Sequence, residues 1–312
     1  MRITALMALL GACGSTGVGA PARDGRSDTC VALDVDERVE PVGLFSRVGG
    51  LAIDASGVVH VVYLRGSERA HVGETAIRYG RRDTEGRWTL ETLAAGPAVE
   101  ARTSELGDSP RCALALGPDG SVHVAFMALS SEGGGLRYAR RRDGDGWSTE
   151  WIDERPGAGL EPSLVVDADG TSHVAFTRYP LPPDDFHGAS AEWVTYARRS
   201  SHGRWAIEQV SERYAGEPRL AVDGSTVRVS LVERDLTREL DRQEPRVVMA
   251  RAPDGSWRTV SDGERLRDVR RGRTVDAFGG THRLFRTEPE RRGDGNVVGW
   301  LRYQAVRRCD PR

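Results

Sequence analysis

Short runs in which hydrophobic and polar residues alternate follow one another along the chain, and one ten-residue pattern recurs among them. The stretch DASGVVHVVY at 54–63 returns as DADGTSHVAF at 167–176 and as DAFGGTHRLF at 276–285. Residues 117–126 keep the Gly, His and aromatic positions, and Asp223 opens a copy that is one residue shorter. Alternating β-branched and aromatic residues beside an Asp–Gly turn predict a pair of antiparallel strands. Each copy is therefore expected to form a β-hairpin.

A second pattern follows each hairpin and adds two more strands. Tyrosine stands nine residues before tryptophan as Tyr79 and Trp88, Tyr138 and Trp147, and Tyr196 and Trp205, with Met249 and Trp257 as a near copy. The histidine position of the hairpin is filled by His60, His123, His173, Arg228 and His282, at intervals of 63, 50, 55 and 54 residues. Four short strands repeated at this period predict an all-β fold, a five-bladed β-propeller of four-stranded antiparallel blades. We expect the Tyr and Trp side chains to pack between adjacent blades.

The two ends of the chain are expected to complete one blade together. The fifth unit stops after a third strand at 300–306, and residues 31–35 form a strand-like run before the first unit. We predict that this N-terminal strand completes the last blade, which closes the ring and covers an exposed sheet edge. Cys30 and Cys309 would then be neighbours able to form a disulfide in an exported protein. Cys112 falls in a first strand and is expected to be a small core residue.

The first residues have the features of a targeting segment, which is not part of the fold. The apolar run after Arg2 is much shorter than the ~18 residues of a membrane-spanning helix, and it ends in Leu-Gly-Ala-Cys, which resembles the lipobox of bacterial lipoproteins. On this interpretation residues 1–12 are a lipoprotein signal peptide, Cys13 carries the lipid, 13–29 form a flexible tether and 30–312 form a single propeller domain. The alternative is an ordinary signal peptide cut near Ala22. The lipoprotein interpretation predicts an outer-membrane anchor, facing the periplasm or the cell surface.

Composition narrows the class of partner. Of the 312 residues, 29% are charged and 38% are hydrophobic, and the formal net charge is −2, which fits a soluble globular body. This balance gives no reason to expect nucleic acid or an anionic membrane surface as a partner. We expect a monomer that meets the membrane through its lipid anchor only, has no cofactor and no metal, and recognises an unknown protein or glycan.

Charged residues stand where several first strands begin, and these are candidates for a binding site. First strands line the channel of a propeller, and equivalent starts carry Arg111, Glu161 and Glu217, with Arg219 two residues after Glu217. Carboxylates and guanidiniums at one mouth suit a polar ligand such as a sugar, and two carboxylates ~5–9 Å apart are what glycoside hydrolysis requires. The alternative is that these residues form ion pairs between blades at a solvated rim.

The connections from second to third and from fourth to first strands are long and differ from one another. Binding usually occurs in variable loops on a uniform scaffold, so His71, Asp184, Asp185 and His187, which lie in these connections, are candidate ligand-binding residues. The repeated histidines each follow a short turn in their own blade, and we expect them to hydrogen-bond the turn Asp or the backbone. The stretch DADG at 167–170 lacks the further acidic ligands of a calcium loop and is expected to be a turn.

The patterns D-x-x-G-x-x-H-V-A-[YF] and L-R-Y-A-R…G-x-W resemble those of BNR/sialidase-like β-propeller proteins of the bacterial predicted-lipoprotein type. The resemblance covers about residues 48–309 and implies a propeller fold, export and carbohydrate binding. Sialidases also carry an F/Y-R-I-P start, which this sequence does not have.

Two functions are consistent with these patterns. The first is a lipid-anchored, non-enzymatic binding or scaffold protein that recognises a protein or glycan through its long loops. The second is a glycan-active hydrolase, sialidase-like or another glycosidase, in which Glu161 and Glu217 are the catalytic acids.

Overall fold

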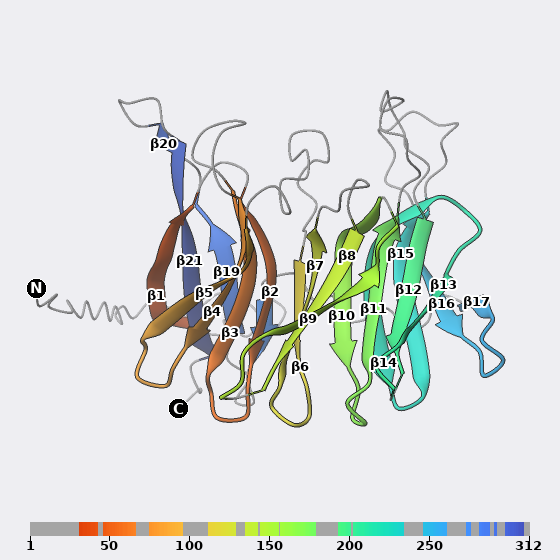
Figure 1. Ribbon diagram of the computed structural model, residues 1–312. Helices are drawn as coiled ribbons and strands as arrows, with labels where there is room; N and C mark the ends of the chain where they lie inside the picture. Colours follow the sequence, from red (N-terminus) through yellow and green to blue (C-terminus); the bar gives the residue numbers. More distant parts are fainter. Residues whose placement is uncertain are drawn as a thin grey trace, which may run out of the picture.

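The computed structural model is built of β-strands throughout the part of the chain that it describes (Figure 1). The described residues are 31–42, 46–66, 75–95, 112–128, 135–142, 144–155, 157–178, 193–200, 202–233, 246–260, 273–275, 281–287, 290–291 and 297–308. They contain no helix, and therefore none that is long and apolar enough to cross a membrane.

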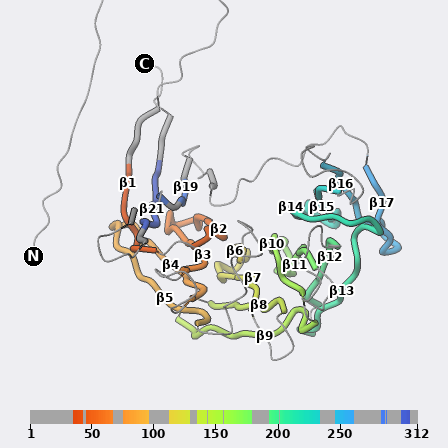
Figure 2. The backbone as a smooth tube through the Cα atoms, turned by 90° about the horizontal axis from the view of Figure 1, so that it is seen from above, coloured from red at the N-terminus to blue at the C-terminus, as the bar shows by residue number. Residues whose placement is uncertain are grey.

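The strands form five antiparallel sheets, and the first four each contain four strands that pair in chain order. The first sheet is β2 (Arg47–Ile53), β3 (Val59–Arg65), β4 (Ala76–Arg82) and β5 (Trp88–Ala95); the second is β6 (Cys112–Leu116), β7 (Val122–Ala128), β8 (Gly135–Arg141) and β9 (Ser148–Asp153). The third is β10 (Ala158–Val166), β11 (Ser172–Arg178), β12 (Trp193–Arg199) and β13 (Trp205–Gln209); the fourth is β14 (Ala215–Asp223), β15 (Thr226–Glu233), β16 (Arg246–Arg251) and β17 (Trp257–Val260). Figure 2 shows these sheets following one another along an arc, with first strands inside and fourth strands outside. The predicted all-β class and antiparallel four-stranded units are confirmed.

The fifth sheet combines the two ends of the described chain. Its order is β18 (Arg273–Val275), β19 (Thr281–Arg286), β21 (Val297–Arg308) and β1 (Val31–Val42), and the short β20 (Glu290–Arg291) also pairs with β21. The pairing of β1 with β21 runs from Val31 and Arg308 to Val42 and Gly299, which confirms the predicted partner and extends it well beyond residue 35. Cys30 and Cys309 are the chain neighbours of the paired Val31 and Arg308 but lie outside the described residues, so their disulfide stays a prediction.

In the first and third sheets, hydrogen bonds from a histidine fasten the hairpin turn to the third strand of the same sheet. In the first sheet, Asp54 Oδ2 lies 3.3 Å from His60 Nε2, and His60 Nδ1 lies 2.7 Å from the Tyr79 hydroxyl. The third sheet repeats this arrangement at 3.1 and 2.7 Å with Asp167, His173 and Tyr196. These contacts confirm the expected bond to the turn Asp for His60 and His173, and they add the tyrosine as a second partner.

A different set of contacts joins neighbouring sheets at four junctions. Glu91 on β5 accepts hydrogen bonds from Arg141 Nη1, at 2.7 and 2.6 Å to its two oxygens, and from Trp147 Nε1 at 2.9 Å. The Trp147 ring also meets Tyr79 edge-on, with centroids 5.2 Å apart. We call Glu91, Arg141 and Trp147 a Glu–Arg–Trp clamp. It recurs as Glu150, Arg199 and Trp205, as Glu208, Arg251 and Trp257, and as Glu37, Arg82 and Trp88.

The last of these clamps joins the fifth sheet to the first, because Glu37 is on β1. The Tyr303 ring of β21 meets Trp88 at the same junction, with centroids 5.7 Å apart. Buried apolar side chains form a core at this junction. Similar cores lie between the first and second, the second and third, and the third and fourth sheets. Cys112 lies in one of these cores with 1% of its surface exposed, as predicted. The expected packing of Tyr and Trp between sheets is thus confirmed.

The fourth sheet differs from the others in the residues that would clamp it to the fifth. Met249 occupies the tyrosine position, and Val260 stands three residues after Trp257, where the first three sheets have glutamate. The described strands of the fourth and fifth sheets lie at opposite ends of the arc in Figure 2. Contact between these two sheets, and with it the closed ring, stays a prediction.

Candidate functional site

The first strands of the third and fourth sheets begin with the same short motif at the same end of the molecule. Glu161-Pro162 lies in β10 and Glu217-Pro218 lies in β14, in each case three residues before a leucine of the inner strand. In Figure 1 the hairpin turns are at the bottom, whereas the connections into β10 and β14 are at the top. We call the top the long-loop end, and both glutamates lie near it on the inner side of the arc.

Both glutamates have a backbone conformation that is unusual for their residue type. Glu161 has φ of 53° and Glu217 has φ of 52°, and they are the non-glycine residues with positive φ in the described chain. Each also precedes a proline, which normally favours an extended conformation. Each falls where the strand pairing shifts register, between Leu160 and Ser163 and between Gly216 and Arg219. Bulges and strained residues of this kind are concentrated at functional sites.

Glu161 positions its counterpart in the next sheet. Its side chain is buried, and Oε2 accepts a hydrogen bond from the Glu217 backbone N–H at 2.6 Å and one from Thr177 Oγ1 at 3.2 Å. Two residues on, Ser163 Oγ accepts a hydrogen bond from Leu220 N–H at 3.0 Å. These side chains of β10 thus fix the backbone of β14 on both sides of the Glu217-Pro218 bulge.

Glu217 points into a different environment. About half of its side chain is exposed (49%), and its carboxylate forms an ion pair of 2.9 Å with Arg246 Nη2 of β16. Arg246 Nη1 also donates to the Glu217 carbonyl oxygen at 3.0 Å. This ion pair lies within the fourth sheet, since β14 and β16 both belong to it. Glu217 is an accessible carboxylate held at a defined place by its own backbone.

Two aromatic residues that the sequence analysis did not select lie at the same end. Trp193 begins β12, and Tyr214 directly precedes β14; their ring centroids are 5.6 Å apart and the rings are tilted by 51°. Arg246 was also not selected. The available signal was their position, since Trp193 and Arg246 both open a third strand directly after a long connection.

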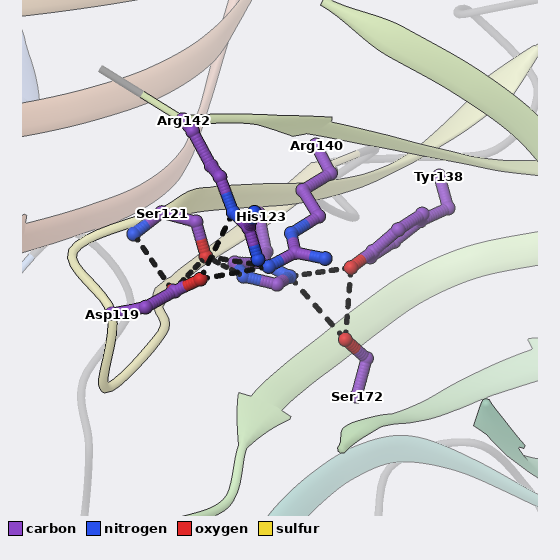
Figure 3. A network of polar contacts seen from close by, with 7 residues as sticks. All are labelled: Asp119, Ser121, His123, Tyr138, Arg140, Arg142 and Ser172. Carbon is purple, nitrogen blue, oxygen red and sulfur yellow. Dashed lines mark hydrogen bonds and ion pairs between the residues drawn. The ribbon is translucent and has the colours of Figure 1, made fainter. Parts of the chain in front are cut away.

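A serine, a histidine and an aspartate meet in the second sheet, but their arrangement is structural. Ser121 Oγ lies 2.6 Å from His123 Nε2 and donates to Asp119 (Figure 3). In a catalytic triad the carboxylate contacts the histidine and the serine is open to substrate. Here the carboxylate contacts the serine, and Ser121 is completely buried. The two residues replace the turn Asp of the other sheets, because Gly117 occupies that position.

The same network continues into the third sheet. The Tyr138 hydroxyl contacts His123 Nδ1 and lies 2.8 Å from Ser172 Oγ of β11 (Figure 3). Burial, followed by the nearby Arg140 charge, lowers the pKa of His123 to about 4. Burial also lowers the pKa of His173, against the opposing effect of Asp167. Both histidines are therefore neutral near pH 7, as structural hydrogen-bonding groups require.

The structure brings together two of the predicted site residues, Glu161 and Glu217, and places Arg219 partly exposed on β14. The other predicted residues lie outside the described part of the chain: Arg111, His71, Asp184, Asp185, His187, Cys13, Cys30 and Cys309. Among the described residues, no group of three or more His, Cys, Asp or Glu side chains could hold a metal ion.

Comparison with known proteins finds similarity at the level of structure. No family model and no curated protein matches the chain. A protein of unknown function from Dyadobacter fermentans DSM 18053 is similar with a TM-score of 0.50 and 12% identity, over 88% of this chain and 99% of that one. The GH32 beta-fructofuranosidase BmSUC1 of Bombyx mori gives 0.49 and 12%, over 85% and 62%. The xylan beta-1,4-xylosidase of Bacillus halodurans C-125 gives 0.43 and 11%, over 87% and 54%. At such identities the similarity concerns the fold alone.

Proposed function

We propose that this protein binds a glycan at the long-loop end of a five-bladed propeller, around the residues where β10 and β14 begin. The observation that carries the proposal is the pair of Glu-Pro bulges with φ of 53° and 52°. A left-handed conformation at a non-glycine residue costs about 1–2 kcal/mol. Here it occurs at two equivalent places, and it directs each glutamate side chain in a direction that a regular strand does not allow.

The charged groups around Glu217 are suited to binding the hydroxyl groups of a sugar. Glu217 is half exposed and paired with Arg246, so a ligand there meets a carboxylate acceptor beside a guanidinium donor. A sugar hydroxyl donates and accepts at the same time, and it can bridge the two groups without bringing a charge of its own. The Arg213 guanidinium, 3.1 Å from Glu233, adds a second balanced pair at the same end.

Hydrolysis of the glycan is a second candidate function. The buried carboxylate of Glu161 contacts the backbone N–H of Glu217, whose own carboxylate is half exposed and paired with Arg246. Glycosidases use two carboxyl groups in different environments, one as acid and one as nucleophile or base. In this version Glu161 has a catalytic role in addition to its role in positioning β14.

The proposal also includes the closed ring and the location of the protein. Closure is supported by the pairing of β1 with β21 and by the Glu37 clamp between the fifth and first sheets. Export and lipid attachment at Cys13 rest on the sequence of the first thirteen residues. An anchored propeller of this kind would present its long-loop end to glycans outside the cytoplasm.

The test is a glycan array followed by calorimetric titration of the bound glycans. We expect Glu217→Gln to weaken binding at least tenfold, because a hydrogen bond to a charged group contributes about 1.5–3 kcal/mol and each 1.4 kcal/mol is a factor of ten. Glu85→Gln, in a hairpin turn at the other end, is the matched control and keeps the wild-type affinity. Absence of any array signal, or equal affinity of the Glu217→Gln variant, contradicts the proposal.

Release of reducing ends from the bound glycan decides between the two versions. Turnover by the wild type that is lost in Glu161→Gln, with binding retained, supports hydrolysis. Binding without turnover supports the non-enzymatic version.

A further inference from the structure

An aromatic pair with one exposed ring lies close in sequence to the proposed glycan site. Tyr214 has 36% of its surface exposed and is the exposed large hydrophobic residue of the described chain. Its partner Trp193 is half-buried, and the two ring centroids are 5.6 Å apart. The other described tyrosines are buried, so the exposure of Tyr214 distinguishes it from the structural tyrosines of the repeat.

The chain between β13 and β14 holds this pair in place through several hydrogen bonds. Val210 N–H donates to the Val194 carbonyl oxygen at 2.9 Å, which ties the connection to the strand that begins with Trp193. Within the connection, Arg213 N–H donates to Ser211 Oγ at 3.1 Å, and Gln209 Nε2 donates to the Ser211 carbonyl oxygen at 2.7 Å. The aromatic pair is therefore mounted on an ordered segment, which lowers the entropy that a ligand must offset.

The aromatic pair is close to Glu217 along the chain. Tyr214 precedes Glu217 by three residues, so their Cα atoms are at most about 10 Å apart. The carboxylate of Glu217 and that of Glu233 each pair with an arginine, at 2.9 and 3.1 Å. A ligand that reaches from the aromatic rings to Glu217 thus meets two carboxylates that are each already paired with an arginine.

From this arrangement we infer that the protein binds an oligosaccharide in an extended pose, with one sugar stacked on Tyr214 and Trp193 and a neighbouring sugar hydrogen-bonded at Glu217. The inference rests on the proposed glycan binding and names the class of glycan as a neutral chain of at least two sugars. Tyr and Trp rings offer an apolar face with a polar edge, which matches a sugar ring, whose C–H face is apolar and whose rim carries hydroxyls.

A protein partner is less well matched to this surface. Stable protein interfaces bury more than about 1,000 Å² in total, and two rings supply only a small part of that. An acidic sugar is also less well matched, because Arg213 and Arg246 already pair with carboxylates of the protein. A neutral oligosaccharide needs neither a large interface nor an uncompensated guanidinium.

The experiment measures how affinity depends on chain length. The full chain is titrated with xylo-, cello- and arabino-oligosaccharides of one to six sugars, together with any neutral oligosaccharide found on the array. For the wild type we expect affinity to rise from the single sugar to the longer chains. In Tyr214→Ala we expect the increase in affinity with chain length to be about tenfold smaller, while the affinity for a single sugar at Glu217 is retained. Tyr214→Phe should keep the full increase, because its ring face is intact.

Each outcome bears on the inference separately from the proposed function. Glycan binding that Tyr214→Ala leaves unchanged at every chain length, or that Tyr214→Phe weakens as much as Tyr214→Ala, overturns the stacking pose alone. Binding of single sugars only has the same meaning. Failure of the wild type to bind any glycan overturns the proposed function, and the inference with it. Because Tyr214 is exposed, its variants are expected to keep the wild-type unfolding temperature, and Trp193→Ala provides a second loss of ring area.

Discussion

Replacement of Glu91 by alanine removes the acceptor of one Glu–Arg–Trp clamp and leaves its two donors in place. The Arg141 guanidinium, whose side chain is 15% exposed, loses two contacts of 2.7 and 2.6 Å, and the Trp147 N–H loses one of 2.9 Å. Burial raises the pKa of the Glu91 carboxyl, but the hydrogen bonds from Arg141 and Trp147 outweigh it, and the pKa lies below its usual value. The charged form of Glu91 therefore stabilises the folded chain.

The size of the loss follows from how exposed the pair is. Breaking a fully buried ion pair costs about 3–5 kcal/mol, whereas an exposed pair contributes about 0–1 kcal/mol. Glu91 is 34% exposed, and the guanidinium keeps its places over the Tyr79 and Trp147 rings at 4.8 and 4.7 Å. We therefore expect Glu91→Ala to lower the free energy of unfolding by about 2 kcal/mol.

Unfolding in guanidinium chloride is measured for Glu91→Ala, Arg141→Met and the double variant. It gives both the loss in free energy of unfolding and the coupling energy between the two residues. A coupling energy of about 1–2 kcal/mol is expected, because the residues are in direct contact. Glu85→Ala, which removes an exposed carboxylate from the turn between β4 and β5, is the matched control and should unfold like the wild type. A loss below about 0.5 kcal/mol, or additive single effects, would refute the role given to the clamp.

Three further predictions concern other parts of the fold. At positive φ glycine is favoured over alanine, so Glu217→Gly should be more stable than Glu217→Ala by about 1 kcal/mol, and the reverse order would show that the backbone there is a regular strand. Because the pKa of His123 is lowered to about 4 by burial and by Arg140, the unfolded chain binds more protons below about pH 6.5; the free energy of unfolding should fall by about 3 kcal/mol as the pH drops from 6.5 to 4, and His123→Asn should lack this part of the pH dependence in otherwise identical denaturation curves. A Cβ added to Gly50 would lie 2.8 Å from the backbone nitrogen of Leu114, so Gly50→Ala should cost about 2 kcal/mol in the same assay, whereas an unchanged stability would mean that β2 and β6 can move apart.

Much of the fold was predictable because the repeat carries its own turn chemistry. The Asp, Gly and His of each copy specify a hairpin, and the turns at Gly57 and Gly170 have φ of 87° and 78°, as the pattern required. The pairing of β1 with β21 was predictable from one missing strand at the end of the chain. The clamp had a visible signal as well, since Glu91, Glu150 and Glu208 each stand three residues after a tryptophan, but local sequence does not show that the partner is in the next sheet.

The candidate site was predictable only in part. The equivalent positions of Glu161 and Glu217 identified them as a pair, but their left-handed backbone could not be foreseen, because a residue before proline is normally extended. The hydrogen bond from the Glu217 backbone N–H to the Glu161 carboxylate depends on how closely the third and fourth sheets pack. The meeting of Trp193 and Tyr214 depends on the pairing of β12 with β13, which brings together residues that are 21 positions apart.

Hydrogen–deuterium exchange with and without a bound oligosaccharide shows where on the chain the glycan lies. We expect slower exchange at the long-loop end of the third and fourth sheets, in residues 158–163 and 210–219, and no change in the hairpin turns 54–58 and 167–171 at the opposite end. Protection confined to those turns, or spread equally over all the sheets, would contradict the proposed glycan site.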